Sequence, residues 1–184
     1  MKTIELVEIA LFTAIIAVLG FLPPIPLPFT PVPITLQNIG VILAGTFLGV
    51  RAATSSMILF VLLIAAGLPI LGGGRGGIGA IVSPSGGFVL GWIVEAFVIA
   101  LILAKFKKPG FWVMIAAGLF AGIVVLYPIG TLWQAWMMHI PWSTALAMSA
   151  VYIPGDTIKT VVVALLAMRL RERIRLTEHA ASYK

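Results

Sequence analysis

The chain has 184 residues, of which 61% are hydrophobic and only 10% are charged, and its formal net charge is +6. Soluble domains are roughly 45 to 50% apolar and about 25% charged, so this composition predicts an integral membrane protein and excludes a disordered chain. Cysteine is absent, which excludes disulfide bonds and thiolate metal sites. The basic residues flank apolar segments, which is typical of membrane topology signals and not of a nucleic-acid-binding surface.

The first apolar segment covers residues 4–22 and is long enough to cross about 30 Å of hydrocarbon as a helix. Glu5 and Glu8 precede its apolar run, which favours a membrane span over a signal peptide. Ala10 and Ala14 are four residues apart, so they share one helix face and let another helix approach closely. This face packs either inside the protein or against a separate subunit.

Six prolines follow between residues 23 and 33, and they predict a stiff, extended loop. A second span is predicted at residues 35–50, with Thr35 and Gln37 at its start. The Gln37 amide either faces a polar ligand or satisfies the exposed end of the helix. A third span is predicted at residues 52–68.

A glycine-rich loop at residues 72–79 contains the pattern G-x-G-x-x-G twice. In dinucleotide-binding proteins this pattern lies between a strand and a helix of a soluble βαβ unit, and no such unit fits between two membrane spans. Dinucleotide binding is therefore excluded. The loop is either a connector or a flexible segment whose backbone N–H groups, including those of Gly76 and Gly77, approach a ligand.

A fourth span is predicted at residues 86–104 and a fifth at residues 110–130. The fourth contains Glu95 near its middle, where a carboxyl group is either hydrogen-bonded within the bundle or functional. The segment from 131 to 151 is rich in tryptophan and leads to Tyr152. Such a segment belongs either to the membrane interface or to the wall of a pocket.

The sixth predicted span, residues 154–170, opens with two opposite charges. Pro154 fits the first turn of a helix, and Asp156 and Lys159 then lie three residues apart on one face. An ionisable residue in a bilayer costs at least about 2.5 kcal/mol on the insertion scale, so a functional site is the default explanation for this pair.

The basic residues predict one orientation of these spans in the plasma membrane, with both termini in the cytoplasm. Arg75 is then external and Lys159 lies within the sixth span. The other ten Lys and Arg residues are all cytoplasmic, as the positive-inside rule requires: Lys2, Arg51, Lys105, Lys107, Lys108, Arg169, Arg171, Arg173, Arg175 and Lys184. In this orientation the Asp156–Lys159 pair, Gln37 and the glycine-rich loop are all at external helix ends, which favours a binding site open to the outside.

The sequence lacks the motifs of several enzyme classes. It has no G-x-x-x-x-G-K-[ST] for ATP, no H-E-x-x-H and no G-x-S-x-G. These absences favour a substrate-capturing subunit that obtains energy from another protein.

Six short motifs, spread over roughly residues 5 to 170, carry a resemblance to a known family. They are Pro31–Gln37, Ala44–Gly49, Gly67–Pro69, Gly76–Gly77, Pro84–Phe88 and Pro154–Lys159. Together they resemble BioY, the biotin-specific S component of energy-coupling factor (ECF) transporters. The resemblance implies one all-α membrane domain of six transmembrane helices over residues 1–184, which binds biotin from outside and has neither enzymatic activity nor a cofactor. It also implies a partner module of one transmembrane coupling protein and two cytoplasmic ATPases, docked at Ala10 and Ala14.

Biotin suits the residues at the predicted external end. Lys159 would bind its carboxylate, Asp156 or Gln37 its ureido group, and apolar or aromatic walls its rings. The full expected site comprises Asp156, Lys159, Gln37, Thr35, Gly76, Gly77, Phe88 and Tyr152. Phe88 departs from the family, which usually has a tyrosine there, and the resemblance assigns no role to Arg75. The alternatives are an S component for another vitamin, a membrane-embedded enzyme and a structural subunit.

Overall fold

The computed structural model describes the backbone of residues 3–181 and the side chains of residues 3–170. Most of this part of the chain is helical, which confirms the expected all-α class. In chain order the elements are α1 (Thr3–Leu19), β1 (Ile25–Leu27), β2 (Thr30–Ile34), α2 (Gln37–Phe47), α3 (Val50–Ala65), α4 (Ile78–Ile81), α5 (Gly86–Leu103), α6 (Phe111–Leu119), the π-helical segment η1 (Phe120–Leu126), α7 (Tyr127–Met138), α8 (Trp142–Ser149) and α9 (Tyr152–Ala181).

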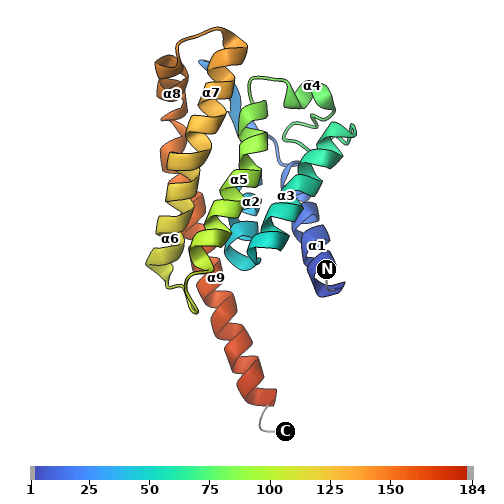
Figure 1. Cartoon of the computed structure of the whole chain (residues 1–184), viewed down its shortest axis with the longest axis vertical. Helices are drawn as coiled ribbons and strands as arrows, with labels where there is room; N and C mark the ends of the chain where they lie inside the picture. Colours follow the sequence, from blue (N-terminus) through green and yellow to red (C-terminus); the bar gives the residue numbers. More distant parts are fainter. Residues whose placement is uncertain (1–2, 182–184) are drawn as a thin grey trace.

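Helix α5 lies inside the bundle and packs against α2, α3 and α7 (Figure 1). It is apolar on nearly every side, as expected for a helix surrounded by other helices. Small residues set the spacing: a Cβ atom at Gly45 of α2 would lie 2.7 Å from the Cβ of Ile99 on α5. The absence of a side chain at Gly45 therefore lets α2 and α5 pack closely.

Two described helical stretches are long and apolar enough to cross a membrane, Gly86–Leu103 and Phe111–Met138. The pair Trp142–Ser149 and Tyr152–Leu170, bent by 50°, meets the same test when it is counted as one broken span. Each of the six segments expected from the sequence coincides with a helix. Because the other described helices do not meet the test of length and hydropathy, six membrane crossings remain a prediction.

The helix of the sixth segment, α9, continues to Ala181, beyond the expected end at residue 170. The fifth segment is also longer than expected. Its helix runs through η1 and α7 to Met138, where we expected an end at residue 130. No residue before His139 breaks the helix; His139 adopts a left-handed backbone conformation with φ 55°, and Pro141 follows. The tryptophan-rich segment is consequently helical, as the end of α7 and as α8.

The proline-rich segment expected to be an extended loop contains a β-hairpin. Strands β1 and β2 pair antiparallel, with Ile25 opposite Ile34 and Leu27 opposite Thr30. Pro31 points to the exterior whereas Val32 is buried, so the hairpin has an outer and an inner face. Residues 32–34 of the hairpin line the cavity that is described below.

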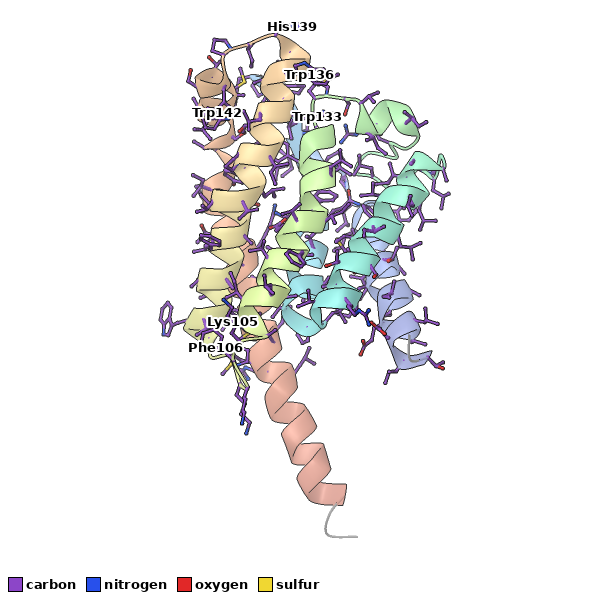
Figure 2. All side chains as sticks on the ribbon, viewed as in Figure 1. Lys105, Phe106, Trp133, Trp136, His139 and Trp142 are labelled. Carbon is purple, nitrogen blue, oxygen red and sulfur yellow. The ribbon has the colours of Figure 1, made fainter. Side chains whose placement is uncertain are left out.

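The two ends of the bundle carry different side chains (Figures 1 and 2). Lys105 and Phe106 lie at the end of the bundle where α1 begins and beyond which α9 projects, whereas Trp133, Trp136, His139 and Trp142 lie at the opposite end with α4. We call the latter the tryptophan end. Lys2 and Lys184 of the topology prediction lie outside the described residues, as do the side chains of Arg171, Arg173 and Arg175.

Candidate ligand-binding site

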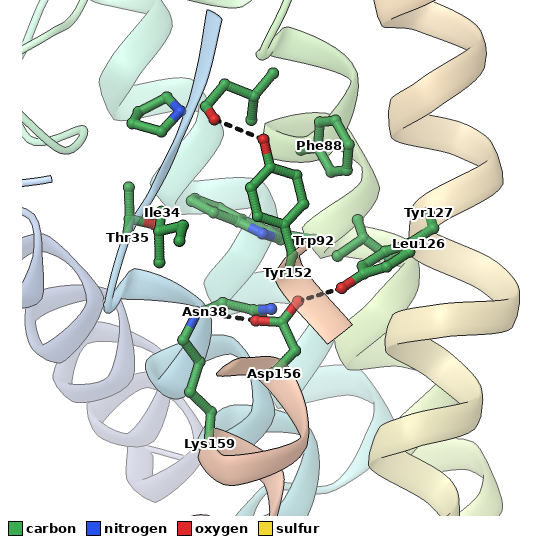
Figure 3. A pocket seen from close by; sticks show the side chains of 12 residues that line it. Ile34, Thr35, Asn38, Phe88, Trp92, Leu126, Tyr127, Tyr152, Asp156 and Lys159 are labelled. Carbon is green, nitrogen blue, oxygen red and sulfur yellow. Dashed lines mark hydrogen bonds and ion pairs between the residues drawn. The ribbon is translucent and has the colours of Figure 1, made fainter. Parts of the chain in front are cut away.

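A cavity of about 70 Å³ lies beneath the hairpin, between α2, α5, α7 and α9 (Figure 3). Residues from five parts of the chain line it: Val32, Pro33, Ile34, Thr35, Asn38, Phe88, Trp92, Leu126, Tyr127, Tyr152, Asp156 and Lys159. Most of the lining is apolar or aromatic, with a few polar groups that converge from α2, α7 and α9. This is the usual make-up of a site for a small organic molecule.

Asp156 and Lys159 form an ion pair at the cavity, with Nζ of Lys159 2.9 Å from Oδ1 of Asp156. Both are on α9, three residues apart, and both side chains are largely buried. The hydroxyl of Tyr127 donates a second hydrogen bond to Oδ2 of Asp156, at 2.7 Å. A buried carboxylate needs such partners, because an unpaired charge in this environment costs several kcal/mol.

Tyr152 ties the hairpin to the start of α9. Its hydroxyl donates to the carbonyl oxygen of Val32 at 2.6 Å and lies 3.3 Å from Oγ1 of Thr30. Gln134 of α7 donates to the same Thr30 oxygen at 3.2 Å. The hairpin is thus held over the cavity by side chains from two helices.

Aromatic rings form the walls of the cavity. Phe88 meets Tyr152 edge-on, with ring centroids 6.4 Å apart and planes at 81°. Trp92 lies one turn further along α5 on the same face and packs against Phe60 of α3. These rings offer flat apolar contact beside the polar groups.

Five of the eight residues expected at the site line the cavity: Asp156, Lys159, Thr35, Phe88 and Tyr152. Gln37 is fully buried elsewhere, where its amide nitrogen donates to the carbonyl oxygens of Ile16 and Ile70, at 3.1 and 2.9 Å. Its amide oxygen accepts from the backbone nitrogen of Gly72 at 2.7 Å. Gln37 therefore joins α1, α2 and the glycine-rich loop.

Gly76 and Gly77 also lie away from the cavity lining. A Cβ atom at Gly76 would lie only 2.2 Å from the carbonyl oxygen of Leu68, so a side chain there would collide with the backbone. Gly77 has φ 78° and donates its backbone N–H to Ile64 at 2.7 Å. Both glycines shape the turn that leads into α4.

Four further residues that were not expected from the sequence line the cavity: Asn38, Trp92, Leu126 and Tyr127. Asn38 is 7% exposed, and its amide oxygen has no hydrogen-bond partner among the described residues. Signals for two of them exist in the sequence: Trp92 follows Phe88 by four residues, and Tyr127 is an isolated hydroxyl in an apolar run.

Glu95 lies in the middle of α5 and is fully buried. Neither of its carboxyl oxygens has a hydrogen-bond partner among the described residues. Oε1 faces the π-helical segment, 3.5 Å from where a Cβ of Gly122 would stand. No cluster of three or more His, Cys, Asp or Glu side chains suited to a metal ion occurs in the part of the chain that the structure describes.

Ala10 and Ala14 are both exposed on α1. Leu11 and Val18 on the same helix are exposed as well, at 54% and 63%. The side of α1 that carries the two alanines thus faces away from the bundle core.

The fold and the cavity together define a helical membrane protein with a site for a small, partly polar organic molecule. The chain belongs to the BioY family, whose model matches residues 1–176. This membership confirms the resemblance that its motifs carry.

Relatives match along nearly the whole chain. A probable biotin transporter BioY of Bacillus subtilis is 43% identical over 97% of this chain and 96% of its own length. The biotin transporter BioY of Rhizobium etli is 44% identical over 90% of this chain and 92% of its own. A crystal structure of the S-component for biotin from an ECF-type ABC transporter superposes with a TM-score of 0.88 at 37% identity, covering 94% of this chain and 95% of that one.

Proposed function

We propose that this chain is the substrate-binding S component of an ECF-type transporter and that it captures biotin from the external side of the membrane. The observation that carries the proposal is the Asp156–Lys159 ion pair at 2.9 Å within an aromatic cavity. Relatives at 43% and 44% identity are named biotin transporters, and the superposed structure is an S-component for biotin. In this role the chain is a transport component and not an enzyme, and biotin is its ligand and not a cofactor.

The groups at the cavity match the ends of biotin. Lys159 supplies the cation for the carboxylate, and a charge-assisted hydrogen bond of this kind is the strongest contact available in the site. Asp156 holds Lys159 in place, and the amide oxygen of Asn38, which has no hydrogen-bond partner among the described residues, accepts from a ureido N–H. The rings of Phe88 and Trp92 pack against the apolar parts of the ligand.

Binding requires the lining of the cavity to move apart. Its volume of about 70 Å³ is well below the range of about 300 to 1,000 Å³ that is usual for ligand sites. Of the lining elements, the hairpin is the shortest and lies at the surface, held by the hydrogen bonds of Tyr152 and Gln134. We infer that the hairpin moves when biotin enters.

The transport step needs partners, because no ATP-binding motif is present in the sequence. We infer a module of one transmembrane coupling protein and two cytoplasmic ATPases, with α1 docking through the face that carries Ala10 and Ala14. The exposure of both alanines supports this assignment, since small residues on a free helix face allow close approach of another helix in a membrane.

The proposed orientation in the plasma membrane has both termini in the cytoplasm. The tryptophan end is then external, and Lys105 lies at the cytoplasmic end with the start of α1 and the end of α9. Lysines at a cytoplasmic span end follow the positive-inside rule, and tryptophans are enriched at both membrane interfaces. The cavity, beneath the hairpin at the tryptophan end, then opens outward.

Equilibrium binding of labelled biotin to the purified chain tests the ligand and the site together. We expect Lys159→Ala and Asp156→Asn each to lower the affinity at least tenfold, because each removes one partner of a buried charge. Arg51→Ala, at an exposed position of α3, is the matched control and should bind as the wild type does. Wild-type affinity in both site variants would refute the site.

Assays on the same purified chain distinguish the alternative functions from biotin capture. A thermal-shift panel of vitamins in which another compound stabilises the chain and biotin does not would identify a different S component. Chemically altered biotin after incubation would indicate an enzyme. No stabilisation by any small molecule would favour a structural subunit.

A further inference from the structure

A second hollow lies outside the cavity, between the hairpin and the loop from Leu71 to Arg75. We call it the outer groove. Its volume is about 410 Å³, which is within the usual range for ligand sites. The hairpin contributes proline rings and Leu27, and the loop contributes Gly72, Gly73 and Arg75. The groove is therefore apolar along one side and cationic at the other.

The loop holds Arg75 in a fixed position. Leu71 and Arg75 exchange two backbone hydrogen bonds, at 3.0 and 3.1 Å, which closes the glycine-rich turn between them. The turn is anchored to the bundle by the bond from the Gly72 nitrogen to Gln37. Arg75 donates from Nε to the carbonyl oxygen of Gly72 at 3.2 Å and from Nη1 to Oγ of Ser85 at 3.0 Å.

Among the described side chains, no acidic group balances the charge of Arg75. Both of its hydrogen-bond acceptors are neutral, and no carboxylate lies within 4.0 Å of it among the described side chains. Partial burial lowers the pKa of Arg75 from its ordinary value, since desolvation disfavours the charged form. An arginine nevertheless remains protonated in proteins, and two of its five N–H donors are used in these bonds.

The outer groove adjoins the binding cavity. Pro33 lines both, so strand β2 is the partition between them. Thr30, which lines the groove, accepts the hydrogen bonds from Gln134 and Tyr152 that hold this strand. A molecule that leaves the groove toward the bundle therefore meets the hairpin first and Lys159 beyond it.

We propose that the outer groove is a first binding station for the carboxylate form of the ligand, with Arg75 as its cation, from which the ligand passes under the hairpin to Lys159. This inference rests on the proposed function. A guanidinium binds a carboxylate through two parallel hydrogen bonds, and the proline rings and Leu27 offer apolar contact for an alkyl chain. A half-buried cation that lines the mouth of a site also raises the rate at which anions arrive.

The test is the association and dissociation rates of biotin, measured by stopped flow on the full chain in nanodiscs of zwitterionic lipid, so that no anionic headgroup competes for Arg75. At low ionic strength we expect Arg75→Gln to lower the association rate constant by about tenfold and to leave the dissociation rate unchanged. The salt dependence of association should weaken in parallel. Arg75→Lys, which keeps the charge, should retain most of the rate.

Two controls isolate the charge of Arg75. Arg51→Gln removes an exposed cation at the other end of α3, beside the start of α1, and should change neither rate. The amide of biotin, which has no carboxylate, should associate equally fast with wild type and Arg75→Gln.

The outcomes separate the two proposals. Wild type that binds no biotin would overturn the proposed function and this inference with it. Wild type that binds biotin with an association rate unaffected by Arg75→Gln would overturn the inference alone. An effect confined to the dissociation rate, or one equally large for the amide, would also overturn it, since it would assign Arg75 a purely structural role.

Discussion

The carboxylate of Asp156 has two donors on different helices, and this arrangement has a consequence for anion binding. Lys159 and Tyr127 each hold one oxygen, at 2.9 and 2.7 Å. A ligand carboxylate at Lys159 competes with Asp156 for the same ammonium group. Because Tyr127 keeps its hydrogen bond to Asp156, the aspartate retains a partner when the lysine turns to the ligand. The free-energy cost of separating the pair is thereby reduced.

Glu95 provides the contrasting case of a buried carboxyl group without a partner among the described residues. Glu95→Gln keeps the shape and removes the ionisable group, so we expect the melting temperature of the purified chain to be unchanged or higher. Glu95→Lys places a fixed charge in the same buried position and should prevent stable folding. Thermal unfolding in detergent measures both. A melting temperature that falls by several degrees in Glu95→Gln would show that the carboxyl group makes a stabilising contact.

At the scale of elements, helix rotation decides which residues face the cavity. Gln37 and Asn38 are neighbours at the start of α2, but successive side chains on an α-helix point about 100° apart. Asn38 consequently lines the cavity, whereas Gln37 points toward α1 and the glycine-rich loop. The sequence indicates that polar groups stand at this helix end, but the direction of each depends on how α2 packs against α1 and α5.

Gln37 and Asn38 give a prediction in which each variant is the control for the other. Gln37→Ala removes three hydrogen bonds that join α1, α2 and the glycine-rich loop, so we expect a loss of stability of about 3 kcal/mol. Asn38→Ala should cost less stability than Gln37→Ala, because the amide oxygen of Asn38 has no hydrogen-bond partner among the described residues. The effects on biotin affinity should be reversed, with Asn38→Ala the weaker binder. Denaturation and binding curves for both variants give the comparison, and weaker binding by Gln37→Ala at full stability would contradict it.

Other elements show why the rest of the site could not be predicted. The apolar runs locate each main helix, since about 20 apolar residues suffice to mark a span. The hairpin gives no such signal, because its prolines interrupt the alternation of apolar and polar residues that indicates a strand. Tyr127 follows seven residues of π-helix, whose wider turns shift the register of every later side chain relative to α6. Its place beside Asp156 follows from that shift.

At the scale of the whole molecule, the cavity and the proposed docking face lie on separate parts of the bundle. The cavity is enclosed by α2, α5, α7 and α9 with the hairpin, whereas Ala10 and Ala14 are on α1, which packs on α2 and α3. The polar contacts of the site come from α2, α7 and α9 and do not involve α1. A change on the exposed face of α1 therefore leaves the ligand contacts in place.

This separation predicts that docking can be abolished without loss of biotin binding. Ala14→Trp adds a large ring to the exposed face of α1, which prevents close approach of a partner helix while touching no cavity residue. We expect biotin affinity equal to wild type, but no co-purification with the coupling protein and ATPases and no biotin uptake into cells. Ala116→Trp, at an exposed position of α6, is the matched control and should preserve all three. Loss of uptake in both variants, or normal co-purification of Ala14→Trp, would move the docking surface away from α1.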